Sequence, residues 1–297
     1  CAMSASLPAP RPISSALAGG IALVCLSSLF FSTAGLFTKG VPEDAWTIVF
    51  WRGLAAAAFT FGYLLTTGRW RREVANFGWP ALFVTLLGAS GSAAFISSFK
   101  LTSVANVALI YATVPFMAAG LAWVCLRERP TRRTLIASLA TLAGVLIIVA
   151  GSVGGISLEG DLLALWMTVT LAGSMVIYRC WPETPAGLPS AFSSIVLLPV
   201  ALLVAAPLDA DPANLPALVG FGLVFAVASI TLMAGARLLP SAETALLSAL
   251  ETPVAPLLAF LFLDEIPPVE TFMGGGLILA AILWAQWPRR ASPAVRA

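Results

Sequence analysis

Two long apolar stretches of this sequence carry polar side chains at a helical spacing. In each stretch, four positions follow one another at intervals of three, four and three residues. They are Ser103, Asn106, Ile110 and Thr113 in the first stretch, where only Ile110 is apolar, and Ser241, Thr244, Ser248 and Glu251 in the second. Such intervals align side chains along one helix face. Two polar faces turned toward a shared interior would line a path, whereas Ser, Thr and Asn in apolar helices also serve simply to hold helices together.

Glu251 is the strongest functional candidate in the second stretch. It lies near the middle of an apolar run, where a charged side chain costs at least about 2.5–3.5 kcal/mol. We therefore expect Glu251 to bind a substrate or to gate a path. Glu243 lies nearer one end of the same run, where it could gate the path or extend its carboxylate to the interface.

Two aromatic residues with a polar atom, Tyr111 and Trp166, also lie inside apolar runs. They could stack on a substrate or fill the core. Together with Asn106, Ser248 and Glu251 they form the predicted substrate-binding set. We expect no catalytic residue, no metal and no cofactor.

Pro115 and Pro253 lie at equivalent places in the two stretches. Each proline removes a backbone hydrogen bond and disturbs the carbonyl four residues earlier, at Tyr111 and Ala249. Proline is common in membrane helices, but two at equivalent positions predict hinges, or carbonyls exposed at a site.

The remaining embedded or interfacial charges favour structural roles. Arg52 lies about two turns into its apolar run, where Asp44 or Glu43 could pair with it. Lys39 and Lys100 end apolar runs and either anchor them at the interface or attract an anionic group.

The composition identifies an integral membrane protein. Of 297 residues 59% are hydrophobic and only 10% charged, with mean hydropathy +0.96, whereas soluble domains carry about 25% charged residues. The net charge is +2 and the positive residues lie in loops rather than along a stripe. We therefore expect the lipid bilayer as a partner and no nucleic acid.

Apolar runs long enough to cross a bilayer recur along the whole chain. They are Ala16–Phe37, Ala45–Thr66, Trp79–Phe99, Val104–Leu126, Leu135–Gly151, Leu162–Trp181, Ser190–Ala206, Ala217–Ala236, Ala242–Leu263 and Thr271–Trp287. We expect two five-helix units, at residues 16–151 and 162–287, between a disordered cytoplasmic tail at 1–15 and a cytoplasmic tail at 288–297. Gly88, Gly91 and the run Gly274–Gly276 should allow close helix packing.

Arginines alternate between the predicted loops and give an orientation. With the N-terminus in the cytoplasm, 13 Lys and Arg residues fall on the inside, and only Lys39 and Lys100 fall on the outside. Positive residues favour the cytoplasmic side of short loops. Both termini are therefore predicted to be cytoplasmic.

The two polar stretches are copies of one unit. A shift of 138 positions places Leu101 on Leu239 and Pro115 on Pro253. Five helices per unit is an odd number, so the second unit must enter the membrane from the opposite side. The predicted fold is an all-α membrane protein with ten transmembrane helices as two inverted five-helix repeats, whose sites lie near the midplane.

Three segments of the sequence resemble the EamA repeat of the bacterial drug/metabolite transporter superfamily. They are SSFKLTSVANVALIYATVPFMAAGLAWVCLRER, LLPSAETALLSALETPVAPLLAFLFLDE and FWRGLAAAAF. The resemblance covers residues 16 to 287 and implies an inner-membrane carrier that exports amino acids and related metabolites. The aromatic amino-acid and methyl-viologen exporters are similar in character. A central cavity lined by helices 1, 3, 4, 6, 8 and 9 is implied as well. Asp264-Glu265 stands where Gly-Glu is usual, and the seventh helix contains Pro199.

Three alternatives to amino-acid export stay open: an intramembrane enzyme, a channel, and a carrier for another metabolite class. The sequence has no His and no HExxH, GxGD or P-loop motif, which disfavours the enzyme. We expect alternating access by a monomer or weak homo-oligomer. Transport should be facilitated by the gradient of small zwitterionic or amphipathic substrates, with Glu251 acting in binding or gating.

The orientation predicts the behaviour of reporter fusions at the C-terminus. A fluorescent protein fused there should be bright, and a phosphatase that folds only in the periplasm should be inactive, because the C-terminus is cytoplasmic. An active phosphatase fusion would contradict both the orientation and the even number of helices.

Overall fold

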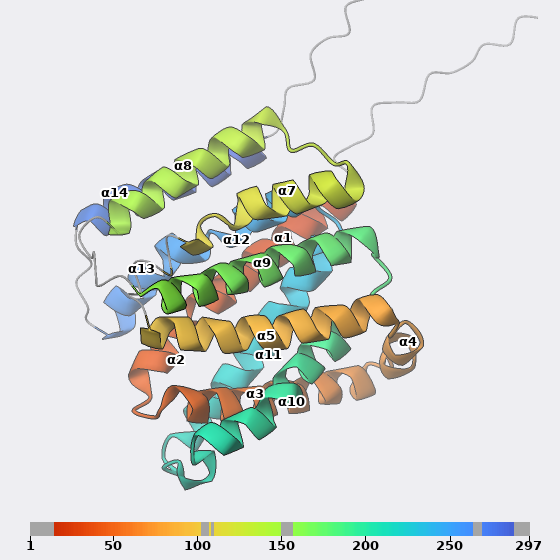
Figure 1. Ribbon diagram of the computed structural model, residues 1–297, viewed down its shortest axis with the longest axis vertical. Coiled ribbons are helices and arrows are strands. Elements are labelled where there is room, and N and C mark those ends of the chain that lie inside the picture. The colour runs from red at the N-terminus through yellow and green to blue at the C-terminus, as the bar shows by residue number, and fades with distance from the viewer. Residues whose placement is uncertain (1–14, 102–106, 108–109, 150–156, 264–268, 288–297) are drawn as a thin grey trace, which may run out of the picture.

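All regular structure that the computed structural model describes, over residues 15–101, 107, 110–149, 157–263 and 269–287, is helical (Figure 1). The helices are α1 Ser15–Ser32, α2 Ala34–Gly40, α3 Ala45–Thr66, α4 Trp70–Ala75, α5 Trp79–Leu101, α7 Val114–Leu126, α8 Arg132–Val149, α9 Leu158–Cys180, α10 Gly187–Val204, η1 Pro207–Asp209, α11 Leu215–Ala236, α12 Ser241–Ser248, α13 Glu251–Leu263 and α14 Val269–Gln286. The predicted tails lie outside the described residues, except that Ser15 already begins α1.

The described helices follow the predicted apolar runs and confirm an all-helical membrane protein. Helix α3 has the predicted bounds, and where the other predicted ends fall on described residues the helices differ from them by a few residues. By length and composition, six of the described helices are long and apolar enough to cross a membrane: α3, α9, α10, α11, α14 and the pair α12–α13. Shorter apolar helices lie at Ala16–Ser32, Trp79–Phe95 and Val114–Leu126.

Three crossings are interrupted, two of them beside the prolines at which we predicted hinges. The first breaks at Thr33 between α1 and α2, and the fourth turns at residues 112–113 just before α7. The ninth breaks at residues 249–250 between α12 and α13. Pro115 and Pro253 explain the last two breaks, because each lies in the first turn of the helix that follows, where proline is tolerated. The Ala249 carbonyl, which cannot pair with Pro253, accepts the Thr252 N–H at 3.1 Å instead.

The packing of the two units is symmetric under their exchange. The helices α1, α3, α5, α7 and α8 of the first unit correspond to α9, α10, α11, α12–α13 and α14 of the second. When each helix is replaced by its counterpart, the contact between α1 and α11 becomes the contact between α9 and α5. In the same way, the contact between α7 and α9 becomes the contact between α12 and α1. It leaves the contacts α3–α10, α7–α12 and α8–α14 unchanged, and all of these contacts are present. Helices α8 and α14 lie together at one side of the bundle (Figure 1).

The loops rich in arginine gather at one end of the bundle, which we call the arginine-rich end. Glu128 after α7 pairs with Arg179 at the end of α9, and Arg179 reaches the Arg237 carbonyl after α11. Arg133 donates to the Trp287 carbonyl after α14 at 2.8 Å. The first turns of α1 lie at the same end, because Gly20 lies against Leu238 and Leu239. Helix α1 therefore starts where its counterpart α9 ends.

Glycines set the closest helix contacts. A Cβ at Gly144 of α8 would lie 2.7 Å from the Gly274 carbonyl oxygen of α14, and one at Gly274 would collide with the Gly144 carbonyl. The predicted packing role holds for Gly88, Gly91, Gly274 and Gly275, each with a neighbour in contact. It is wrong for Gly276, around which a Cβ would meet open space.

The contrast between these glycines predicts a pair of stability effects. Gly274→Ala should lower the free energy of unfolding by about 1–3 kcal/mol, because a methyl group is forced into a closed backbone contact. Thermal unfolding of the detergent-solubilised protein measures this loss. Gly276→Ala is the matched control and should leave the unfolding temperature unchanged or slightly raised, since Ala favours helix. Equal losses in both variants would contradict the α8–α14 contact.

Candidate functional site

A polar cluster of Tyr111, Ser248 and Glu251 lies where the fourth and ninth crossings are interrupted. The Tyr111 side chain lies beside the Glu251 carboxylate and beside Ser248, whose hydroxyl donates to the Ala245 carbonyl at 2.9 Å. Ser248 is 5% exposed, whereas Tyr111 and Glu251 are partly accessible. The structure thus brings together three of the five predicted substrate-binding residues, from two helices at equivalent positions. Their role in binding stays a prediction.

Helix α1 holds the interrupted ninth crossing in place. The Ser28 hydroxyl lies 3.3 Å from the Leu247 carbonyl and 3.0 Å from the Val24 carbonyl of its own helix, and the Ser32 hydroxyl lies 3.5 Å from the Glu251 carbonyl and 2.7 Å from the Ser28 carbonyl. Both serines are buried. Each hydroxyl has a single proton, so its contact with the ninth crossing shares that proton with a carbonyl of α1.

The cluster is rich in hydrogen-bond acceptors. It contains the Glu251 carboxylate and lies at the C-terminal end of α12, where carbonyl groups and the helix dipole favour positive charge. Glu251 itself is the first residue of α13, and the N-terminal end of that helix stabilises the carboxylate. A primary ammonium group has the charge and the three donors that this arrangement can accept.

The other predicted site residues lie apart from the cluster or outside the described residues. Trp166 lies on α9 with 48% of its surface exposed, and Asn106 falls outside the described residues. Glu243 is partly buried in the first turn of α12. Pro115 is buried in α7, and Pro253 packs against Gly275 of α14. The breaks beside both prolines are observed, but their action as hinges is untested.

Arg52 does not pair with Asp44 or Glu43, so that prediction is wrong. Asp44 caps α3 by accepting the N–H groups of Trp46 and Thr47, and Glu43 accepts from Asp211 and Asn214. The local spacing suggested a pairing, but Asp44 accepts backbone N–H groups and Glu43 accepts the Asp211 N–H and the Asn214 side-chain amide instead.

The Arg52 side chain is directed into the bundle. It is 8% exposed, and its Nη2 donates to the Ser92 hydroxyl of α5 at 3.2 Å. Its guanidinium lies over the rings of Phe225 and Phe221 of α11, 4.2 and 5.6 Å from their centres. A desolvated cation–π contact is worth about 2 kcal/mol, less than the at least ~2.5–3.5 kcal/mol that a charge costs in the membrane.

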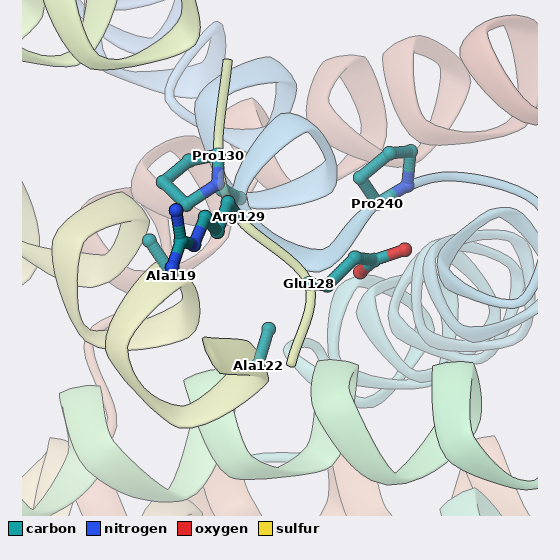
Figure 2. Close-up of a pocket in the computed structure, with 7 residues that line it drawn as sticks. Ala119, Ala122, Glu128, Arg129, Pro130 and Pro240 are labelled. Atoms are coloured by element: carbon teal, nitrogen blue, oxygen red, sulfur yellow. The ribbon is translucent and has the colours of Figure 1, made fainter. Parts of the chain in front are cut away.

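An ion pair links α7 to α9 at the arginine-rich end. Arg179 donates through Nε and Nη2 to Glu128 Oε1 at 3.2 and 2.9 Å, and both side chains are 31% exposed. The chain reaches Glu128 because Arg127 adopts φ 54°, which ends α7 with a left-handed residue. Figure 2 shows Glu128 directed toward Pro240 and Arg129 turned toward Ala119. The hollow between them has about 20 Å³ of open volume, room for a single water molecule.

Sequence reasoning missed Glu73, which stabilises the start of α10. Its carboxylate oxygens accept the N–H groups of Gly187 and Leu188 at 3.2 and 2.8 Å. A carboxylate at the N-terminal end of a helix satisfies unpaired donors and the helix dipole. Glu73 lies 114 residues before Gly187, so no local pattern could have indicated this contact.

A family comparison agrees with this architecture. The model of the EamA-like transporter family matches the chain twice, over residues 18–150 and 160–286. The chain belongs to the EamA-like transporter family. The resemblance to the EamA repeat of the drug/metabolite transporter superfamily is thereby confirmed.

Relatives of this EamA-like transporter give the same picture. It is 27% identical over 274 residues to the uncharacterized transporter YwfM of Bacillus subtilis (strain 168), covering 88% of this chain and 91% of that protein. It also superposes on a crystal structure of a protein with 18% identity and a TM-score of 0.79, covering 91% of this chain and 96% of the other. That second likeness concerns the fold. The family and the relative's name point to a multi-pass membrane transporter rather than an enzyme.

The closure of the arginine-rich end of this EamA-like transporter is testable by thiol labelling. Glu128→Gln should raise the reaction rate of Cys180 with a membrane-impermeant maleimide about two- to five-fold, because a partly exposed ion pair contributes up to about 1 kcal/mol. The measurement uses protein whose other cysteines are replaced by serine.

Glu183→Gln is the matched control, since it breaks the pair with Arg72 at 3.8 Å, whose side chains are about 80% exposed. The control should not change the labelling rate. Equal rates for Glu128→Gln and the parent protein would show that the Glu128–Arg179 pair does not keep this end closed.

Proposed function

We propose that this EamA-like transporter is an inner-membrane carrier that exports amino acids, including aromatic and hydrophobic ones, and related small metabolites. The observation that carries the proposal is the cluster of Tyr111, Ser248 and Glu251 at two interrupted helices. Discontinuous helices near the membrane midplane are a common way to build substrate sites in secondary carriers.

The chemistry of the cluster supports an amino-acid substrate. A carboxylate beside helix-terminal carbonyls suits an ammonium group, and the Tyr111 ring adds an aromatic surface. An intramembrane carboxylate is expected to be functional by default. The predicted aromatic residue Trp166 would contact the substrate during another step of the cycle.

The proposed mechanism is alternating access between the two ends of the bundle. Equivalent helices run in opposite directions, so one unit can close one end with the contacts that its counterpart uses at the other. The Glu128–Arg179 pair closes the arginine-rich end here. Pro115 and Pro253 would act as hinges and Glu243 as a gating residue, with the arginine-rich end in the cytoplasm.

The proposed driving force is the substrate gradient, with Glu251 acting in binding or gating. Histidine is absent from the chain, and the first unit has Thr113 where the second has Glu251. A single carboxylate that contacts Tyr111 suits substrate orientation better than a proton relay, for which the fourth crossing offers no acidic counterpart. We propose a monomer or weak homo-oligomer as the working unit.

Transport by purified protein in liposomes tests the proposal. The wild-type protein should exchange L-phenylalanine and L-leucine without a pH gradient, and Glu251→Gln should reduce this flux at least ten-fold while leaving the unfolding temperature close to that of the wild type. The isosteric amide removes the charge that would bind the ammonium group. Glu183→Gln serves as control, because that carboxylate is exposed, and should transport normally.

Two results would contradict these proposals separately. If the liposomes carry none of the amino acids but carry phosphorylated sugars, the substrate class is wrong. If the wild type accumulates amino acids uphill on an imposed pH gradient and Glu251→Gln loses only that component, Glu251 couples protons and the facilitated mechanism is wrong.

A further inference from the structure

A surface hollow of about 380 Å³ lies beside the last turn of α7, at the arginine-rich end. Its lining residues are Trp123, Val124, Arg127 and Arg129. The volume falls within the range of about 300–1,000 Å³ that is usual for small-ligand sites. This hollow is separate from the one beside Glu128 that has room for a single water molecule, although Arg129 borders both. Half of its lining is apolar and half is cationic.

The two arginines of this hollow have no acidic partner in the part of the chain that the structure describes. Both are exposed, and the described carboxylates form no ion pair with either of them. Glu128 lies between them in the sequence, but it pairs with Arg179, and Figure 2 shows Glu128 and Arg129 directed to opposite sides of the loop. The segment 127–133 contains four arginines and one glutamate. A cluster of four or more basic residues beside a membrane helix is typical of segments that attract anionic lipid.

The apolar half of the hollow lies on an exposed side of a membrane helix. Trp123 is 57% exposed and Val124 is 75% exposed. Gly120, one turn before Val124, is exposed as well, and a Cβ there would meet open space. Because the chain belongs to a family of multi-pass membrane transporters, lipid surrounds such a surface. Tryptophan is enriched at the level of the lipid headgroups, so the hollow spans the boundary between headgroups and acyl chains.

We propose that this hollow binds an anionic phospholipid, with the phosphate between Arg127 and Arg129 and an acyl chain along Trp123 and Val124. The planar fork of an arginine matches phosphate oxygens in two hydrogen bonds. A soluble phosphate would satisfy the arginines but leave the apolar half uncovered, and a zwitterionic lipid would bring its own cation to two cations. The inference goes beyond the proposed function and does not depend on it, since the hollow lies outside the predicted substrate-binding set.

Native mass spectrometry of the full-length protein in detergent tests the assignment, because it counts the molecules that stay bound. Titration with dioleoyl-phosphatidylglycerol and dioleoyl-phosphatidylcholine compares an anionic with a zwitterionic headgroup on identical acyl chains. Glycerol 3-phosphate supplies the phosphate without an acyl chain. The variants are the double change Arg127→Gln/Arg129→Gln and the single change Trp123→Ala. The matched control is Arg71→Gln/Arg72→Gln, which removes two exposed arginines of α4.

We expect the wild type to bind phosphatidylglycerol at least about five-fold more tightly than phosphatidylcholine, because each basic residue near the headgroup favours the anionic lipid. Glycerol 3-phosphate at equal concentration should not displace it. Arg127→Gln/Arg129→Gln should lose the preference and keep an unfolding temperature close to that of the wild type. The two single variants should each lose part of it, and they suffice if the double variant does not fold. Trp123→Ala should weaken both lipids to a similar degree, and the control should keep the preference.

Several results would overturn the assignment. These are equal binding of the two lipids by the wild type, an unchanged preference in the folded Arg127→Gln/Arg129→Gln variant, and unchanged binding of both lipids by Trp123→Ala. An equal loss in the control would show that the preference follows the net charge rather than this hollow. Displacement by glycerol 3-phosphate would assign the arginines to a soluble phosphate, and a dimer that only the double variant lacks would assign the hollow to a second copy of the chain.

Discussion

A backbone that crosses hydrocarbon has to satisfy its own hydrogen bonds, and proline prevents this at two equivalent places in the bundle. Pro115 and Pro253 interrupt the fourth and ninth crossings. Two buried hydroxyl groups of α1 lie against carbonyls on both sides of the break in the ninth crossing. The same break positions Glu251 beside Tyr111. Backbone satisfaction and site geometry therefore depend on one another, and this explains why polar residues concentrate here.

The second constraint is the cost of charge inside the membrane. Glu251 lies at the start of α13, where the helix dipole favours a carboxylate. Contacts with aromatic rings and one hydroxyl offset part of the cost of the Arg52 charge. Among the described residues, no salt bridge joins these two charges. At the arginine-rich end, by contrast, Glu128 and Arg179 form an ion pair that links the end of α7 to the end of α9.

Local signals in the sequence predicted much of this structure. Hydropathy located α3 to the residue, and the prolines located the breaks, because both effects act within a few residues. The sequence placed Tyr111, Ser248 and Glu251 in one predicted substrate-binding set, and the structure brings these three together. The break at Thr33 and the contact of Glu73 with α10 were not predicted. The pairing of Arg52 was wrong, because partners 40 and more residues away compete with the adjacent acids, and local spacing carries no information about them.

The most direct measurement is an experimental structure with L-phenylalanine bound. The account predicts its ammonium group within hydrogen-bonding distance of the Glu251 carboxylate, at the break between α12 and α13, with the Tyr111 hydroxyl beside it. A ligand bound elsewhere, while Tyr111 and Glu251 still contact only each other, would contradict the central claim that this polar cluster is the substrate site.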